Sequence, residues 1–165
     1  MSIALNEINR LSREEFVRVV GPVFEHSPWI AEVAAQQRPF PTCAALHAAM
    51  CAIVQSAAEA QQLALIRAHP DLVGRVVLTA ESNREQTAAG LMQLTPEEVT
   101  LFDRYNTEYK SRFGFTFIIC ARKNKKEAIL SAFPVRLKNS REAEIRTALD
   151  QIFQIAELRL TDLIT

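Results

Sequence analysis

Residues 43–68 read CAALHAAMCAIVQSAAEAQQLALIRA, and HPDLVGR follows directly at residues 69–75. Alanine and leucine are strong helix formers, and the first stretch contains neither glycine nor proline. Thr42 stands immediately before it and can cap its first turn. Pro70 disfavours a helical backbone at His69, so the helix should end there. The stretch therefore predicts one bent helix or two consecutive helices, with His69 at the exit.

The remainder of the chain follows the same helical pattern, because apolar residues recur at steps of three and four and only four glycines occur. Ser12 and Glu15 form a capping box for a helix that should run to about Val20. Further helices are predicted from Ser27 to about Gln37, from Ser82 to Ala89 before Gly90, from Thr95 to Phe113, from Asn124 to a break at Pro134, and from Ser140 to Ile164. The prediction is an all-α, single-domain multi-helix bundle over residues 1–165, with a short extended apolar segment near 115–121.

Composition excludes several classes of protein. Nineteen basic and nineteen acidic residues balance, so the chain has no broad positive field for nucleic acid or an anionic membrane. Three cysteines without CxxC spacing indicate neither a disulfide framework nor a zinc site, and no glycine-rich phosphate loop is present. The first residues carry charges throughout, and no run approaches the roughly 18 apolar residues of a membrane span. A cytoplasmic protein without a peroxisomal address is expected.

Two residues are candidates for proton transfer, although each also has an ordinary structural explanation. His69 could serve as general acid or base, or its imidazolium could simply interact with the dipole of the preceding helix. Glu85 stands three residues after Ser82, which is the spacing of a capping box, and this spacing favours a structural role. Glu81 lies four residues earlier and would share a helix face with Glu85.

Arg159 interrupts the apolar stripe of the last predicted helix, which is formed by Ile145, Leu149, Ile152, Ala156 and Leu163. A cation therefore occupies a core-facing position, where an unpaired charge is expensive. Two interpretations are open. The side chain extends to the rim of the core, or it meets an anion.

Four segments together resemble one family. HPDLVGR at residue 69, ESNREQTAAGL from Glu81, RFGFTFIICAR from Arg112 and ELRLTDL near the end are similar to motifs of the ureidoimidazoline decarboxylases of urate breakdown. These enzymes convert 2-oxo-4-hydroxy-4-carboxy-5-ureidoimidazoline (OHCU) into (S)-allantoin. The resemblance covers nearly the whole chain. It departs at Thr116, where the family usually has proline, and this change loosens the local backbone.

The resemblance implies a role for each matched residue. His69 and Glu85 would be catalytic, with the EQ pair favouring Glu85 over Glu81, because a carboxylate beside an imidazole favours its protonated form and orients its proton. The resemblance also implies a small-molecule ureidoimidazoline substrate, no cofactor, no metal, a homodimer and a functional link to the upstream hydroxyisourate hydrolase. The implied substrate-binding residues are Pro70, Ser82, Gln86, Arg159 and the segment Phe117, Ile118, Ile119, Cys120 and Ala121, which acts through its backbone and as an apolar wall.

Two other functions stay open at this point. The chain could be a non-catalytic helical adaptor, in which His69 and Glu85 only serve helix ends, or an enzyme acting on another ureide or small heterocycle. An adaptor has no reason to gather His69, Glu85 and Arg159 around one concave pocket. The group that delivers the final proton is also open, since His69, Glu85 and an ordered water could each serve.

Overall fold

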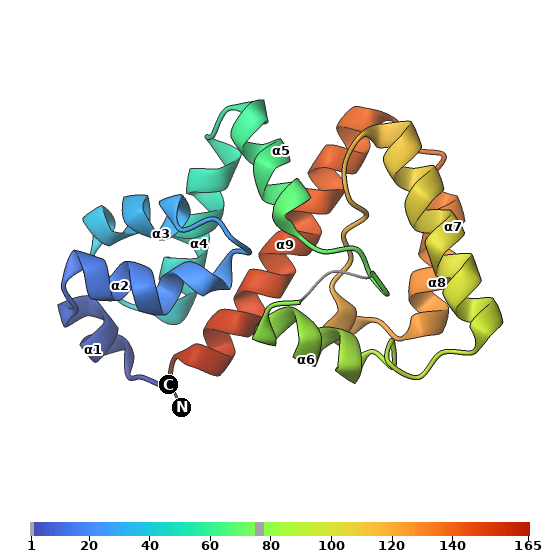
Figure 1. Cartoon of the computed structure of the whole chain (residues 1–165). Helices are drawn as coiled ribbons and strands as arrows, with labels where there is room; N and C mark the ends of the chain where they lie inside the picture. Colours follow the sequence, from blue (N-terminus) through green and yellow to red (C-terminus); the bar gives the residue numbers. More distant parts are fainter. Residues whose placement is uncertain (1, 75–77) are drawn as a thin grey trace. The chain divides into compact units, whose positions relative to one another are not determined.

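A computed structural model describes residues 2–74 and 78–165 (Figure 1). Within these residues the chain forms nine α-helices, three 3-10 helices and no strand, which confirms the all-α prediction. The chain divides into two compact units: unit 1 comprises Met1–Ala68 and Phe153–Thr165, and unit 2 comprises His69–Ile152. The prediction of a single domain over 1–165 stays a prediction.

Unit 1 is built from short helices, and side chains cap the N-termini of α2 and α4. Ser12 Oγ accepts the N–H of Glu15 at 3.2 Å, and the Glu15 carboxylate accepts the N–H of Ser12 at 3.0 Å, so the predicted capping box is present. Thr42 accepts the N–H of Ala45 at 3.0 Å, as predicted. The helices are α1 (Leu5–Arg10), α2 (Arg13–Val20), η1 (Gly21–Val23), α3 (Trp29–Ala34), η2 (Ala35–Gln37), α4 (Cys43–Gln55), α5 (Glu59–Ala68) and the end of α9 (Arg141–Leu163).

The alanine-rich stretch forms two helices, α4 and α5, in agreement with one of the predicted alternatives. Their axes are bent by 118° across the break. Gln62 Nε2 donates to the carbonyl of Val54 at 2.9 Å and so satisfies a carbonyl of the last turn of α4. Among the described residues no single helix is long and apolar enough to cross a membrane, and α4 with α5 meets that criterion only as this bent pair.

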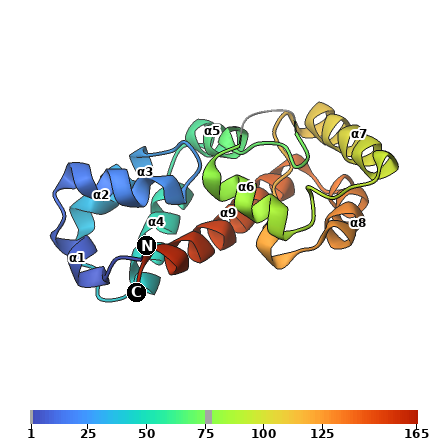
Figure 2. The ribbon, with the colours of Figure 1, turned by 60° about the horizontal axis from the view of Figure 1, so that its bottom comes forward.

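The two ends of the chain meet within unit 1 (Figures 1 and 2). The N–H of Ile3 donates to the carbonyl of Leu163 at 2.8 Å, and the N–H of Thr165 donates to the carbonyl of Ile3 at 3.1 Å. These bonds form an isolated parallel bridge between Ile3 and Ile164. The last turn of α9 is therefore tied to the residues that precede α1.

Three predicted helix starts or breaks are wrong. Ser27 does not cap α3, because its hydroxyl donates to the carbonyl of Glu25 at 2.9 Å and the helix begins at Trp29. Asn124 does not cap α8, because its side chain donates to the carbonyl of Cys120 at 2.9 Å. Pro134 does not break α8 but lies inside it. The missing N–H falls near the C-terminal end of this helix, and the ring is exposed.

Unit 2 surrounds an aromatic core. Phe117 stacks on Phe133 with ring centroids 3.8 Å apart, and Tyr105 stacks on Phe133 at 5.0 Å. Within residues 96–113, Phe102 is fully buried, whereas Val99 near the helix start is 44% exposed. The elements of unit 2 are α6 (Ala80–Ala88), α7 (Pro96–Phe113), η3 (Ala121–Lys123), α8 (Lys126–Arg136) and the first part of α9.

A buried polar network holds unit 2 together around Glu144, which is completely inaccessible to solvent. Tyr109 Oη donates to Glu144 Oε2 at 2.6 Å, and Arg136 Nε donates to the same oxygen at 2.9 Å. Asn139 Nδ2 donates to Oε1 at 2.8 Å. Burial, followed by the hydrogen bond to Glu144, raises the pKa of Tyr109 well above its usual range, so the phenol stays a hydrogen-bond donor.

Glu144→Gln should therefore strongly destabilise the protein. The variant leaves the Arg136 guanidinium buried without its counter-charge, which costs about 3–5 kcal/mol in comparable pairs. Urea unfolding would measure this loss. Glu98→Gln is the matched control, because Glu98 pairs with Lys126 at 3.0 Å with about a quarter of each side chain exposed. It should cost less than about 1 kcal/mol, and similar losses in the two variants would contradict the prediction.

Candidate functional site

His69 lies where the sequence predicts, at the exit of a helix. Helix α5 ends at Ala68, and His69 is the first residue outside it. The imidazole is 7% exposed, so it belongs to a buried environment rather than to the surface. The end of α5 therefore places the titratable side chain of His69 in a buried position.

The side chain of Gln86 contacts the backbone of the loop after His69 at two residues. The N–H of Val73 donates to Gln86 Oε1 at 3.2 Å, and Gln86 Nε2 lies 3.5 Å from the carbonyl of Asp71. Val73 adopts a left-handed backbone with φ 58°, which is uncommon for a β-branched residue. The amide of Gln86 thus bridges both sides of a tight turn, and this turn begins two residues after His69.

Helix α7 holds the same loop from a second direction. Asn106 Nδ2 donates to the carbonyl of Leu72 at 2.8 Å in a buried bond, and Lys110 Nζ meets Asp71 Oδ2 at 2.5 Å. Asn106 is 7% exposed. The backbone that follows His69 is therefore fixed by polar side chains from both α6 and α7.

Asn106→Leu should impair both stability and turnover. The replacement keeps the branched shape and the number of non-hydrogen atoms but leaves the buried Leu72 carbonyl without its donor, which costs about 1–3 kcal/mol. A loop released near His69 would also lower kcat by roughly tenfold to a hundredfold, since small displacements of a reacting group are costly. Urea unfolding and initial rates measure the two effects. Thr107→Leu places the same side chain on the exposed face of α7, and a comparable loss there would contradict the prediction.

Helix α6 begins one turn earlier than the sequence suggests, so the predicted capping box of Ser82 and Glu85 is wrong. The N-cap is Thr79, whose hydroxyl accepts the N–H of Ser82 at 3.2 Å. Thr79 and Ser82 are both residue types that can cap a helix N-terminus. The helix begins after Thr79, the earlier of the two. Glu85 consequently lies in the second turn of α6, and its carboxylate is not needed for capping.

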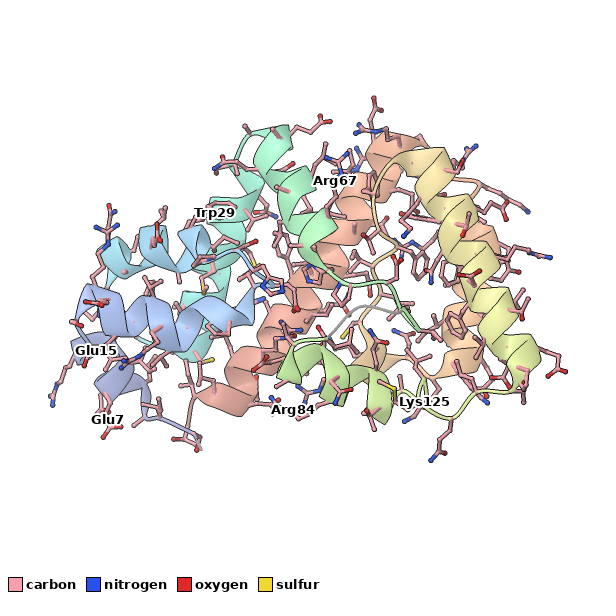
Figure 3. All side chains as sticks on the ribbon, in the orientation of Figure 1. Glu7, Glu15, Trp29, Arg67, Arg84 and Lys125 are labelled. Atoms are coloured by element: carbon pink, nitrogen blue, oxygen red, sulfur yellow. The ribbon has the colours of Figure 1, made fainter. Side chains whose placement is uncertain are left out.

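The buried face of α6 carries the residues that the sequence singles out. Ser82 and Gln86 are 5% and 4% exposed, four residues apart on one side of the helix, and Glu85 is half-buried beside them. Glu81 is engaged differently, because its carboxylate pairs with Arg84 at 3.7 Å. Arg84 lies on the outer side of α6 (Figure 3). Ser82 and Gln86 are thus the buried positions of α6, whereas Glu81 and Glu85 are both half-buried and Glu81 pairs with the exposed Arg84.

Residues 115–120 form neither helix nor strand, and they pass through the core as the sequence predicts for an extended apolar segment. Phe115, Thr116, Phe117, Ile118 and Cys120 are all buried, and Ile119 is half-buried. The backbone of Cys120 is extended, with φ −72° and ψ 97°. At Thr116, where the resemblance leads us to expect proline, the side chain is 7% exposed.

Side chains of unit 2 already bind part of this backbone. The N–H of Cys120 donates to Gln151 Oε1 at 2.9 Å. The carbonyl of Ile118 accepts from Arg136 Nη1, which connects the segment to the Glu144 network. A backbone N–H has one hydrogen, so the N–H of Cys120 is occupied in this structure. These bonds fix the position of the segment before any ligand binds.

Helix α6 packs against the end of this segment (Figure 2). Lys125 Nζ donates to the carbonyl of Ala88 at 2.7 Å. Burial raises the pKa of the Cys120 thiol, and the negative charge of Glu85 adds to this effect, so the thiol is protonated near neutral pH. Cys120 is therefore a buried thiol rather than a nucleophile, and Glu85 lies close enough to influence it.

Arg159 belongs to unit 1, where it is 6% exposed and meets an anion of the protein itself. Its Nη1 donates to Glu25 Oε2 at 2.9 Å and lies 3.3 Å from the carbonyl of Pro22. Of the two interpretations of this core-facing cation, the structure supports the one in which it meets an anion. Glu25 was not singled out from the sequence, although a carboxylate inside the run GPVFEHSPW was a signal that could have found it.

The structure thus brings three predicted parts together in unit 2: the loop that follows His69, the inner face of α6 and the segment 117–121. A cavity of about 550 Å³ adjoins α6 in this unit. Its described lining includes Gln86, Asn83, Leu91 and Met92. A buried histidine, a half-buried carboxylate and apolar walls within one unit are typical of the class of small-molecule enzymes that work by acid–base chemistry.

Comparison with known proteins specifies the family. The family model described as OHCU decarboxylase matches residues 9–161. The 2-oxo-4-hydroxy-4-carboxy-5-ureidoimidazoline decarboxylase of Haloferax volcanii is 41% identical over 97% of this chain and 95% of its own length. The enzyme of the same name from Amia calva is 42% identical over 97% and 94%.

A solved structure agrees. The crystal structure of (S)-allantoin synthase matches 98% of this chain with a TM-score of 0.81 and 30% identity, and this chain spans about half (54%) of that chain. The protein belongs to the OHCU decarboxylase family. It is a carboxy-lyase that decarboxylates OHCU to (S)-allantoin in urate degradation. This membership decides against the helical adaptor.

Proposed function

We propose that His69 and Glu85 together carry out the proton transfers of OHCU decarboxylation. The observation that supports this pairing is the position of α6, which packs against the segment ending at η3 and also holds the loop after His69 through Gln86. Because Thr79 caps α6, Glu85 does not serve as the capping-box residue of this helix. A half-buried carboxylate and a buried imidazole in one small unit suit general acid–base catalysis.

The reaction follows from the substrate's own structure. His69 accepts the proton of, or polarises, the ring hydroxyl beside the carboxylate, with Glu85 orienting the imidazole. The bond from the ring carbon to the carboxylate then breaks, carbon dioxide leaves, and the electron pair spreads into the conjugated ring. A ring nitrogen takes up a proton, and the carbon that bore the carboxylate becomes a carbonyl carbon as its hydroxyl proton leaves. Addition of a proton to one face of the neighbouring ring carbon, which carries the ureido group, gives the S configuration. In this proposal no cofactor takes part, because the ring itself accepts the charge.

The remaining predicted residues would hold the substrate. Arg159 binds its carboxylate or a ring oxygen, since guanidinium groups suit planar oxyanions. Ser82 and Gln86 contribute hydroxyl and amide groups from the inner face of α6. The apolar wall and backbone contacts are proposed for Pro70, Phe117, Ile118, Ile119, Cys120 and Ala121. With the N–H of Cys120 occupied by Gln151, we assign the N–H contacts to the neighbouring positions.

Nuclear magnetic resonance tests this assignment without altering the backbone. (S)-allantoin, as the product, is titrated into ¹⁵N-labelled protein while amide signals are followed. We expect saturable shifts for residues 117–121 and for α6, and much smaller shifts for α1 and α2. Shifts confined to other parts of unit 2 would contradict the proposed site. Racemic allantoin at equal concentration should give about half the apparent affinity if only one enantiomer binds.

We also propose a homodimer and a cytoplasmic location. The homodimer rests on the family resemblance, and the location rests on three cysteines without disulfide spacing. Light scattering coupled to size-exclusion chromatography measures the first. A functional link to the upstream hydroxyisourate hydrolase is proposed because that class of reaction supplies the substrate. A coupled assay with and without the hydrolase would measure it.

A further inference from the structure

We propose that Glu25 is a positioning residue that fixes the guanidinium of Arg159 for substrate binding. This inference rests on the proposed role of Arg159 as a substrate-binding residue. Glu25 lies 134 positions away in the sequence, between η1 and α3, and its side chain is almost completely buried. Its position next to Arg159 is therefore a product of the fold of unit 1.

The geometry determines the plane of the guanidinium. Arg159 Nη1 has two hydrogens, and it contacts Glu25 Oε2 at 2.9 Å and the Pro22 carbonyl at 3.3 Å. Two acceptors on one nitrogen restrict rotation of the planar group about its long side chain. The Glu25 carboxylate and the Pro22 carbonyl thus hold the Arg159 guanidinium in one orientation.

The turn that carries Glu25 is itself fixed. Ser27 Oγ donates to the carbonyl of Glu25 at 2.9 Å, and the N–H of Ser27 donates to the carbonyl of Phe24 at 3.3 Å. Phe24 is 1% exposed, and His26 adopts a left-handed φ of 45°. Since these contacts anchor the backbone on both sides of Glu25, the carboxylate has little freedom to follow a moving guanidinium.

Stability alone is a weak explanation for this pair. Replacement of a buried ion pair by apolar side chains is often neutral or stabilising, because both charges must be removed from water. The surrounding face of α9 is apolar, with Ile155, Ala156 and Leu160 all buried. The ion pair of Arg159 and Glu25 is better explained by its effect on binding: it holds the guanidinium in one orientation before the substrate binds.

Loss of Glu25 should therefore weaken substrate binding more than chemistry. Arg159 stays charged in the Glu25 variants, so without Glu25 its guanidinium would turn towards another partner or towards water. Substrate would then have to reorient it on binding. We expect Glu25→Ala to raise KM by about tenfold or more, with a smaller change in kcat. Glu25→Gln keeps an acceptor oxygen in place and should show a smaller increase.

The test combines kinetics with a double-mutant cycle. Initial rates of (S)-allantoin formation and melting temperatures are measured for Glu25→Ala, Glu25→Gln, Arg159→Met and the Glu25→Ala/Arg159→Met double variant. If Glu25 acts through Arg159, the double variant has the same KM as Arg159→Met alone. Asn9→Ala is the matched control in unit 1, because Asn9 only joins α1 to Phe40 through bonds of 2.9 and 2.8 Å. It should lower the melting temperature and leave KM unchanged.

The possible outcomes separate this inference from the proposed function. An unchanged KM in Arg159→Met would reject the substrate-binding role of Arg159 itself. A raised KM in Arg159→Met, together with multiplicative effects in the double variant, would reject only the positioning role of Glu25. If Glu25→Ala fails to fold, Glu25→Gln decides the question: a folded Glu25→Gln protein with the KM of the unmodified enzyme would overturn the inference.

Discussion

His69→Asn is expected to lower kcat by at least about a hundredfold while the fold remains intact, because a positioned general acid or base contributes roughly 10²–10⁴ to the rate. Asparagine approximates the near part of the imidazole ring and retains polar atoms, but it cannot accept and return a proton near neutral pH. His69 is 7% exposed, so the smaller asparagine leaves some space unfilled, and the melting temperature is measured beside the kinetics. Turnover should suffer far more than stability.

The measurement is circular dichroism of the allantoin formed when urate is oxidised and hydrolysed enzymatically in the same cuvette. The unmodified protein should give a rapid (S)-allantoin signal, and His69→Asn should give only slow, racemic product. His47→Asn is the matched control, since His47 Nε2 bonds the Phe153 carbonyl at 2.8 Å within unit 1 and has no proposed catalytic role. Full activity of His69→Asn, at an unchanged melting temperature, would reject the mechanism.

Glu85→Ala should lower kcat by about a hundredfold without weakening α6. If Glu85 capped the helix, as its spacing from Ser82 suggests, its removal would cost about 1 kcal/mol and would confuse the result. The structure assigns that role to Thr79, so the expected cost in stability moves to Thr79→Ala. The catalytic loss arises because the imidazole loses the carboxylate that orients it and stabilises its protonated form.

Two controls accompany Glu85→Ala. Glu81→Ala removes a carboxylate from the same helix, but one that pairs with Arg84 on the solvent side, and its kcat should stay near that of the unmodified enzyme. Thr79→Ala should lower the free energy of unfolding by about 1 kcal/mol, whereas Glu85→Ala should not. The assignment of Glu85 would be wrong if Glu81→Ala lost turnover and Glu85→Ala retained it.

The local features of the helices could be predicted because they depend on residues close in sequence. The capping box of Ser12 and Glu15 and the caps at Thr42 and Thr95 each join a side chain to a backbone N–H three residues later. The exit of α5 before His69 follows from Pro70. The start of a helix cannot be predicted from capping residues alone where two are present, as at Thr79 and Ser82. The choice between them depends on the packing of the whole helix.

The sequence by itself determined the all-α class and the family, and from the family resemblance it predicted the residues that we propose for the chemistry. It also showed that Arg159 is a cation on a core-facing stripe. Only the tertiary structure decided its partner, Glu25, because a buried charge is satisfied by whatever the fold brings near it. The same reason applies to Glu144, whose contacts with Tyr109 and Arg136 join three helices. Local spacing specifies a helix end, whereas the pairing of buried charges depends on how the helices pack.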